Sequence, residues 1–168
     1  MRPLIIAVLA AFAAFAASPA RPATPFPPRA AGPDLALAVT AAQGAVRACR
    51  QRGFPIAVLV VDSAGEPEVL LVREGAPQIA ASFARRKTAL TMRYHDASGA
   101  VAARAAGDTK LAAEIKADPA IGMALPGALP IIAGGKQVGA IAASGAGSAK
   151  MDEDCARAGL DTIARRLR

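Results

Sequence analysis

A lysine stands within an apolar stripe near the middle of the sequence. The stripe follows one face of an expected helix at spacings of 4, 4 and 3 residues: Ile79, Phe83, Lys87, Leu90. A lysine in such a place either extends its amine to the surface or binds an anion in a cleft. Because Arg85 and Arg86 flank Lys87, this face is a candidate site for a ligand that carries a carboxylate.

Two further polar residues are candidates for the same ligand site. Arg73 ends an expected strand; the alternative is that it forms a salt bridge with Glu74, Glu66 or Glu68. Ser144 ends another expected strand just before glycines, where a hydroxyl can reach a ligand. The predicted ligand-binding set is therefore Arg73, Arg86, Lys87 and Ser144.

The sequence gives little support for catalysis or for a nucleotide site. Without a partner histidine, Ser144 is not an activated nucleophile, and two Cys and one His are too few for a dedicated zinc site. The glycines at Gly145 and Gly147 lack the third glycine of a dinucleotide loop and the second parallel strand that such a site needs. Asp152, Glu153 and Asp154 come directly after them and would repel a phosphate. We therefore expect a binding protein rather than an enzyme.

The elements that position these residues follow from hydrophobic periodicity. Apolar residues recur with helical spacing from Leu35 to Cys49, with Asp34 as N-cap and Gly53 as the C-terminal glycine. Further helices are expected over 78–94, 97–106, 108–118 and 150–167, and strands over 56–61, 69–73, 121–125, 129–133 and 136–144. Gly134-Gly135 suits a type I′ hairpin between the last two strands. The predicted order is α-ββ-α-α-α-βββ-α, an α+β fold with a five-stranded antiparallel sheet packed with helices.

The N-terminal part has the composition of a targeting segment. Residues 1–20 combine Arg2, an apolar run and small residues, as a secretory signal peptide does, with cleavage after Ala16 or Ala20. The alternative, a membrane anchor, is disfavoured because Pro19 and Arg21 end the apolar run early. Residues 21–33 are a Pro-rich tether, and residues 34–168 form the domain. We expect a periplasmic or secreted protein without stable membrane insertion.

Charge and cysteine content narrow the partners and the compartment. The formal net charge of +7 favours anionic partners, but one Tyr and no Trp leave few side chains for base stacking, so nucleic acid is not expected. Hydrophobic residues make up 54% and aromatic residues 4% of the chain, which predicts a closely packed core of small side chains. In an oxidising compartment Cys49 and Cys155 would form one disulfide between the first and last helices; otherwise they are two buried thiols.

Four segments in order resemble a known family: "VLVVDSAGEPEVLLVREGA" (58–76), "ARRKTALT" (84–91), "LPGALPIIAGGKQVGAIAASGA" (125–146) and "DEDCARAGLDTI" (152–163). Together they look like the GlcG/HbpS haem-binding-like family, which is similar to the C-terminal domain of the PduO corrinoid adenosyltransferases. The resemblance covers about residues 35–167. It implies a five-stranded antiparallel sheet between helices and assembly into homo-oligomers. It also implies haem as a possible ligand, with a corrinoid as the alternative.

The chain departs from that family at the positions where iron ligation would be expected. A histidine that exported relatives have near residues 75–79 is absent, because this chain reads Gly75-Ala76-Pro77-Gln78-Ile79. The single histidine, His95, follows the helix instead, where it either caps the helix end or ligates haem iron. The leading interpretation is an exported protein that binds haem or a related tetrapyrrole. The alternatives are an enzyme or accessory protein of small organic acid catabolism, and a structural homo-oligomer.

Overall fold

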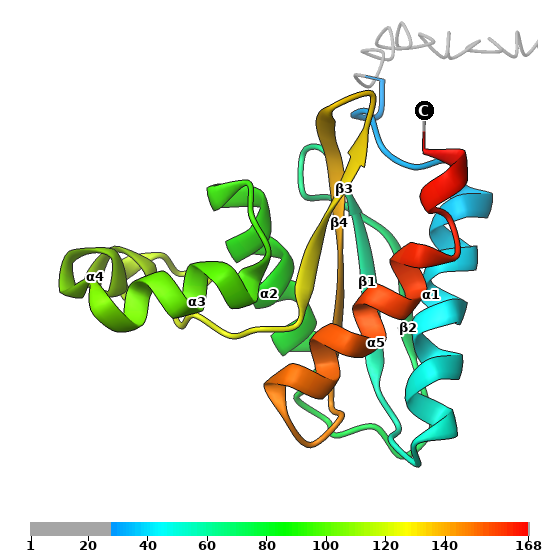
Figure 1. Ribbon diagram of the computed structural model, residues 1–168, viewed down its shortest axis with the longest axis horizontal. Coiled ribbons are helices and arrows are strands. Elements are labelled where there is room, and N and C mark those ends of the chain that lie inside the picture. Colours follow the sequence, from blue (N-terminus) through cyan, green and yellow to red (C-terminus); the bar gives the residue numbers. More distant parts are fainter. Residues whose placement is uncertain (1–27, 168) are drawn as a thin grey trace, which may run out of the picture.

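The computed structural model describes residues 28–167 (Figure 1). The predicted signal peptide and the first part of the tether lie outside the described residues. The described part contains five α-helices, four strands and a final 3-10 turn. In chain order they are α1 (Leu35–Gln51), β1 (Ala57–Asp62), β2 (Pro67–Val72), α2 (Ala80–Tyr94), α3 (Ser98–Gly107), α4 (Thr109–Ala117), β3 (Ala128–Ala133), β4 (Lys136–Ser144), α5 (Ala149–Asp161) and η1 (Ala164–Arg166).

The sheet is antiparallel, in the order β2-β1-β4-β3. Every residue of β1 is buried, as expected for a central strand that is covered on both faces. Two glycines with positive φ, Gly134 (55°) and Gly135 (76°), form the β3–β4 turn, which confirms the predicted hairpin. The α+β class is confirmed, but the sheet in the described residues has four strands, not five.

The missing fifth strand was predicted over residues 121–125, which form a turn and an extended connection. Ile121 is buried against α3 and α4, so its apolar side chain belongs to those helices and not to the sheet. The backbone N–H groups of Ile121 and Gly122 donate to the Asp118 carbonyl at 3.1 and 2.8 Å. The Ile121 carbonyl accepts from the Arg86 guanidinium at 2.9 Å. The backbone of Ile121 is therefore satisfied without a neighbouring strand.

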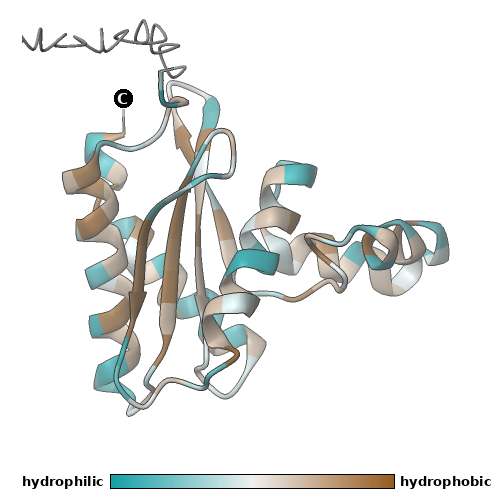
Figure 2. Ribbon diagram, turned by 180° about the vertical axis from the view of Figure 1, so that it is seen from behind, coloured by the Kyte–Doolittle hydropathy of each residue, from teal (hydrophilic) through white to brown (hydrophobic). Residues whose placement is uncertain are grey.

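Helices cover the two faces of the sheet unequally. Helices α1 and α5 lie side by side on one face, and α2 lies on the other, against β1, β4 and β3 (Figures 1 and 2). Small residues bring α1 and α5 close together, because a Cβ on Gly159 would overlap the carbonyl oxygen of Ala41. This packing confirms the core of small residues that the composition predicted.

Helices α3 and α4 project beyond β3 as an arm (Figure 1). The arm packs on α2 through a separate apolar cluster: Leu90, Val101, Ala105, Ile115, Ile121.

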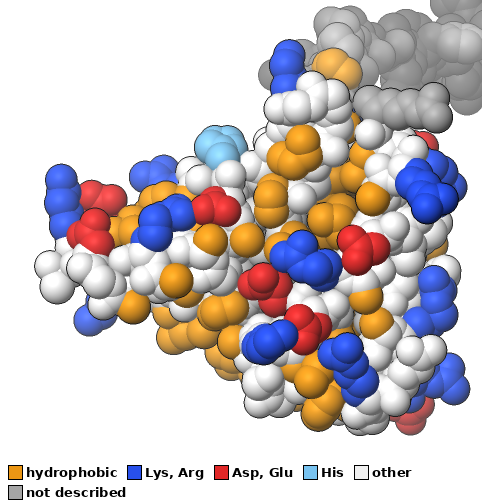
Figure 3. All heavy atoms as spheres, in the orientation of Figure 1, with side chains coloured by type: hydrophobic (Ala, Val, Ile, Leu, Met, Phe, Trp, Pro, Cys, Tyr) orange, Lys and Arg blue, Asp and Glu red, His pale blue; other side chains and the backbone are white. Residues whose placement is uncertain are grey.

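On the face shown in Figure 3, Lys and Arg side chains lie beside Asp and Glu side chains, so the net positive charge forms no single basic patch there. Among the helices of residues 28–167, none combines the length and hydropathy needed to cross a bilayer.

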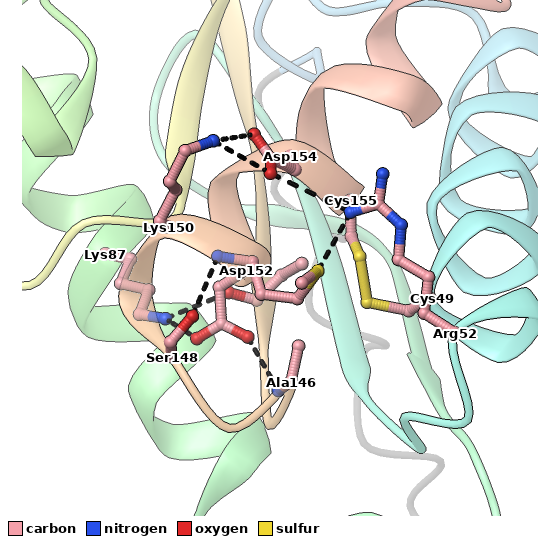
Figure 4. Close-up of a disulfide and its surroundings, with 11 residues drawn as sticks. Cys49, Arg52, Lys87, Ala146, Ser148, Lys150, Asp152, Asp154 and Cys155 are labelled. Carbon is pink, nitrogen blue, oxygen red and sulfur yellow. Dashed lines mark hydrogen bonds and ion pairs between the residues drawn. A yellow bond between two sulfur atoms is a disulfide. The ribbon is translucent and has the colours of Figure 1, made fainter.

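A disulfide joins the two helices on the first face. Cys49 of α1 and Cys155 of α5 are bonded across a sequence separation of 106 residues, and both are fully buried. The predicted bridge between the first and last helices is therefore present (Figure 4). A cross-link over so long a loop strongly restricts the unfolded chain.

Replacing both cysteines should destabilise the protein markedly. We expect Cys49→Ala/Cys155→Ala to lower the free energy of unfolding by about 2–5 kcal/mol, because the unfolded chain regains loop entropy. Urea denaturation followed by circular dichroism measures this change. Wild-type protein that is unfolded, reduced and refolded under reductant serves as the control and should match the variant. A variant as stable as the oxidised wild type would contradict the expectation.

Candidate functional site

A cleft of about 360 Å³ opens where the first turn of α2, the end of β4 and the start of α5 meet. Its apolar wall is made by five side chains: Pro77, Ile79, Phe83, Leu125, Pro126. Its polar part consists of Lys87, Ser144, Ser148 and Asp152. Clefts that bind small molecules usually combine a largely apolar lining with a few convergent polar groups. This cleft has that character.

Lys87 and Asp152 form a buried ion pair in the polar part of the cleft. The lysine Nζ lies 2.6 Å from Asp152 Oδ2 and donates a second hydrogen bond to the Ala143 carbonyl at 3.0 Å. The two residues are only 3% and 6% exposed. Figure 4 shows the pair at the point where α2 and the first turn of α5 approach each other. The pair thus joins elements from the two opposite faces of the sheet.

Burial lowers the pKa of Lys87, while the hydrogen bond and the charge of Asp152 act in the opposite direction. Asp152 is therefore what keeps the buried ammonium favourable. The interpretation in which Lys87 extends its amine to the surface is wrong, because the side chain is only 4% exposed. The anion that Lys87 binds in this structure belongs to the chain itself.

Local sequence at the start of α5 places the Asp152 carboxylate. Ser148 is the N-cap, and its Oγ accepts a hydrogen bond from the Met151 N–H at 3.2 Å. Gly145 and Gly147, with φ of 115° and 77°, turn the chain from β4 into this cap. The Ala146 N–H then donates to Asp152 Oδ1 at 2.8 Å. Both carboxylate oxygens of Asp152 are thus used inside the protein.

Sequence reasoning missed this role of Asp152 and treated it only as an acid near a helix N-terminus. A signal for it was present. Asp152 falls on the buried stripe of α5 with Cys155, Ala156 and Gly159, whereas Glu153 and Asp154 lie off that stripe. A carboxylate on an apolar stripe and a lysine on another are each costly to bury alone. Each therefore indicates a partner of opposite charge.

Ser144, a predicted ligand-binding residue, lies at the end of β4 and lines the cleft. The residue is 3% exposed. Its hydroxyl takes part in no hydrogen bond among residues 28–167, although its neighbour Ala143 accepts from Lys87. The fully buried side-chain atoms without a partner among the described residues are Glu68 Oε2 and Thr91 Oγ1. The Ser144 hydroxyl is not one of them, so it keeps contact with the solvent of the cleft and can bind a group that enters there.

The other two members of the predicted ligand-binding set lie elsewhere. The Arg86 guanidinium donates to the Ile121 carbonyl and does not line the cleft, so it fastens the arm. Arg73 follows β2 and its backbone N–H donates to the Ile56 carbonyl at 3.0 Å; the residue does not line the cleft. The structure therefore brings together Lys87 and Ser144 but not Arg73 and Arg86.

His95, the predicted haem ligand, also lies outside the cleft. It ends α2 in the left-handed conformation with φ of 53°. Its exposed ring places Nδ1 2.9 Å from Gln137 Oε1. Within the described residues, no three His, Cys, Asp or Glu side chains gather as a metal site would require.

Comparison with known proteins supports one family. Residues 34–161 match the family model described as "Haem degrading protein HbpS-like". The chain belongs to the HbpS-like family. A search of the curated proteins found no match.

Solved structures agree with that assignment. A double mutant of Streptomyces reticuli HbpS is 30% identical, with a TM-score of 0.73, and the match covers 88% of this chain and 98% of that one. Klebsiella pneumoniae ORFY, 17% identical, has a TM-score of 0.74 and the match covers 84% and 97% of the two chains. A PduOC–haem complex, 20% identical, has a TM-score of 0.71 with 79% and 95% covered. The last two show that the fold is shared.

Removing one partner of the ion pair should be far more damaging than removing a surface lysine. We expect Lys87→Met and Asp152→Ala each to lower the free energy of unfolding by about 3–5 kcal/mol, because each leaves an uncompensated buried charge. Equilibrium urea denaturation with the disulfide intact measures the change. The double variant Lys87→Met/Asp152→Ala should lose less than the sum of the two single losses.

Lys150→Met is the matched control for Lys87→Met. Lys150 also pairs with a carboxylate, Asp154, at 3.0 Å, but its side chain is 84% exposed. Its loss should cost less than about 1 kcal/mol. Equal effects of the two Lys→Met substitutions would contradict the role assigned to the buried pair.

Proposed function

We propose that the protein binds haem or a related tetrapyrrole in the cleft between α2 and α5. The observation that carries the proposal is membership of the HbpS-like family, whose model is described as haem degrading. The relative at 30% identity over most of both chains is an HbpS. The complex of PduOC with haem supports the proposal from the fold alone.

The lining of the cleft suits part of a tetrapyrrole. Pro77, Ile79 and Phe83 offer an apolar surface to a flat macrocycle. Ser144 and the amine of Lys87 lie where a polar substituent would enter. The formal net charge of +7 favours the approach of a ligand with negatively charged carboxylates. The apolar side chains therefore suit the macrocycle of a haem, and Ser144 and Lys87 suit its propionates.

A haemin titration tests the proposal. Purified protein at micromolar concentration should shift the Soret band of haemin saturably. Ile79→Asp should weaken binding at least tenfold, because it removes apolar contact and places a carboxylate near the propionates. Ile79 is 53% exposed at the start of α2, a place where an acid is compatible with the helix dipole.

Leu35→Asp is the control for Ile79→Asp. Leu35 is 64% exposed at the first residue of α1 and is not part of the cleft lining, so this variant should bind haemin as the wild type does. An unshifted Soret band would contradict haem binding. Equal weakening by the two variants would contradict the assignment of the cleft. A parallel titration with a corrinoid distinguishes the two classes of tetrapyrrole.

We also propose that the protein is exported to an oxidising compartment. The composition of residues 1–20 supports a signal peptide, and the Cys49–Cys155 disulfide is typical of exported proteins. The full chain expressed in a Gram-negative host should appear in the periplasm with an N-terminus after Ala16 or Ala20. Intact mass spectrometry measures this. Protein found only in the cytosol with residues 1–20 retained would contradict export.

A further inference from the structure

We infer that the cleft recognises the carboxylate edge of a tetrapyrrole and not its metal. A porphyrin without iron should then bind as well as haemin. The inference rests on the proposed function and makes it more specific, since it names the part of the ligand that the protein recognises. It follows from three features of the cleft: the atoms that line it, the hydrogen-bond donors left free there, and its distance from His95.

The lining residues include no common axial ligand of haem iron. Among the described residues that line the cleft, none is His, Cys, Met or Tyr, the side chains that usually bind haem iron. The one side-chain nitrogen is Lys87 Nζ, which already makes hydrogen bonds to Asp152 Oδ2 and to the Ala143 carbonyl. The donor set of this cleft therefore disagrees with iron ligation.

Hydrogen-bond donors do remain for a carboxylate. A lysine ammonium has three N–H donors, and the structure assigns two, to Ala143 and Asp152. Ser144 is 3% exposed, and its hydroxyl makes no hydrogen bond within residues 28–167 but is not a fully buried atom, so it remains open to the cleft that it lines. Ala149, the first residue of α5, also lines the cleft and brings a backbone N–H that no intrahelical carbonyl can accept. All three residues belong to the lining of the same cleft.

The acidic residues nearby do not cancel this site. The two oxygens of Asp152 accept from Ala146 and Lys87. Asp154 pairs with Lys150 and lies outside the lining. Glu153, 3.5 Å from Arg157, is outside it as well. A carboxylate in the cleft therefore faces donors and a neutral ion pair, not a free anion.

The size and position of the cleft separate it from the single histidine. A volume of about 360 Å³ is near the lower end of the range for small-molecule sites, so the cleft takes one edge of a macrocycle. Ile79 and His95 flank the two ends of α2, about 24 Å apart along the axis at a rise of about 1.5 Å per residue. An edge held beside Ile79 and Ser144 leaves the centre of the macrocycle far from His95.

Three ligands test the inference in one buffer with the same co-solvent. Haemin, metal-free protoporphyrin IX and protoporphyrin IX dimethyl ester are titrated against the full domain, with absorbance and porphyrin fluorescence anisotropy as readouts. We expect Kd values for haemin and protoporphyrin IX within threefold of each other. The ester should bind at least tenfold more weakly, because it cannot accept charge-assisted hydrogen bonds.

Variants then assign the contact to named atoms. Ser144→Ala should weaken protoporphyrin IX binding about tenfold, the size of one hydrogen bond to a charged group, and leave the affinity of the ester unchanged. Ser63→Ala, at an exposed serine in the β1–β2 turn, should change neither. Thermal unfolding of Ser144→Ala verifies that a lost affinity is not lost folding.

Each contrary result has its own meaning. Haemin binding at least tenfold tighter than protoporphyrin IX, with the Soret shift abolished by His95→Ala, would overturn the inference and retain the proposed function. An ester that binds as well as the free acid would overturn carboxylate recognition. Failure of all three ligands to bind would overturn the proposed function itself.

Discussion

The ion pair between Lys87 and Asp152 is the constraint on which the rest of the site depends. It joins α2 on one face of the sheet to α5 on the other, around the end of β4. Two buried charges are favourable only as a hydrogen-bonded pair, so the two helices cannot move apart at this point without exposing or orphaning them. The position of α5 in turn fixes the Ser148 cap and the turn at Gly145 and Gly147 that bounds the cleft.

The disulfide fastens the same helix, α5, to α1. Asp152 and Cys155 are three residues apart on the buried stripe of α5, so successive positions of one helix face are fastened to α2 and to α1. Figure 4 shows both attachments within the first turns of the helix. A rigid first turn favours ligand binding, because side chains that packing already holds in place lose little conformational entropy when a ligand binds.

Local signals predicted much of this architecture. The Asp34 cap at 2.8 Å from the Leu37 N–H, the Gly134-Gly135 hairpin and the helix before Tyr94 all follow from residues close together in the chain. Residues 121–125 do not form the expected strand, because Ile121 packs in the apolar cluster of the α3–α4 arm. Its apolar side chain suits a helical cluster as well as a strand. Only the tertiary structure decides between those partners.

The candidate site was less predictable, for a similar reason. Lys87 was identified from its apolar stripe and Ser144 from its position after a strand, and both line the cleft. The sequence also favours Arg86, because it flanks Lys87, and Arg73, because it ends an expected strand. The structure uses the Arg86 guanidinium for a backbone carbonyl of the arm. Charge and sequence proximity do not specify which side of a helix a long side chain follows.

The resulting site has a polar part that is neutral overall and an apolar wall. A lysine already neutralised by Asp152 can still donate hydrogen bonds, but it does not attract anions as a free cation would. In the proposed binding, selectivity would depend on hydrogen-bond geometry at Ser144 and the start of α5, and on apolar contact with Ile79 and Phe83.

A crystal structure of the protein with protoporphyrin IX tests this account most directly. One propionate should lie within hydrogen-bond distance of both Ser144 Oγ and Lys87 Nζ, with an edge of the macrocycle against Ile79 and Phe83 and the Lys87–Asp152 pair intact. A porphyrin bound beside His95, or one in the cleft with its propionates directed into solvent, would contradict it.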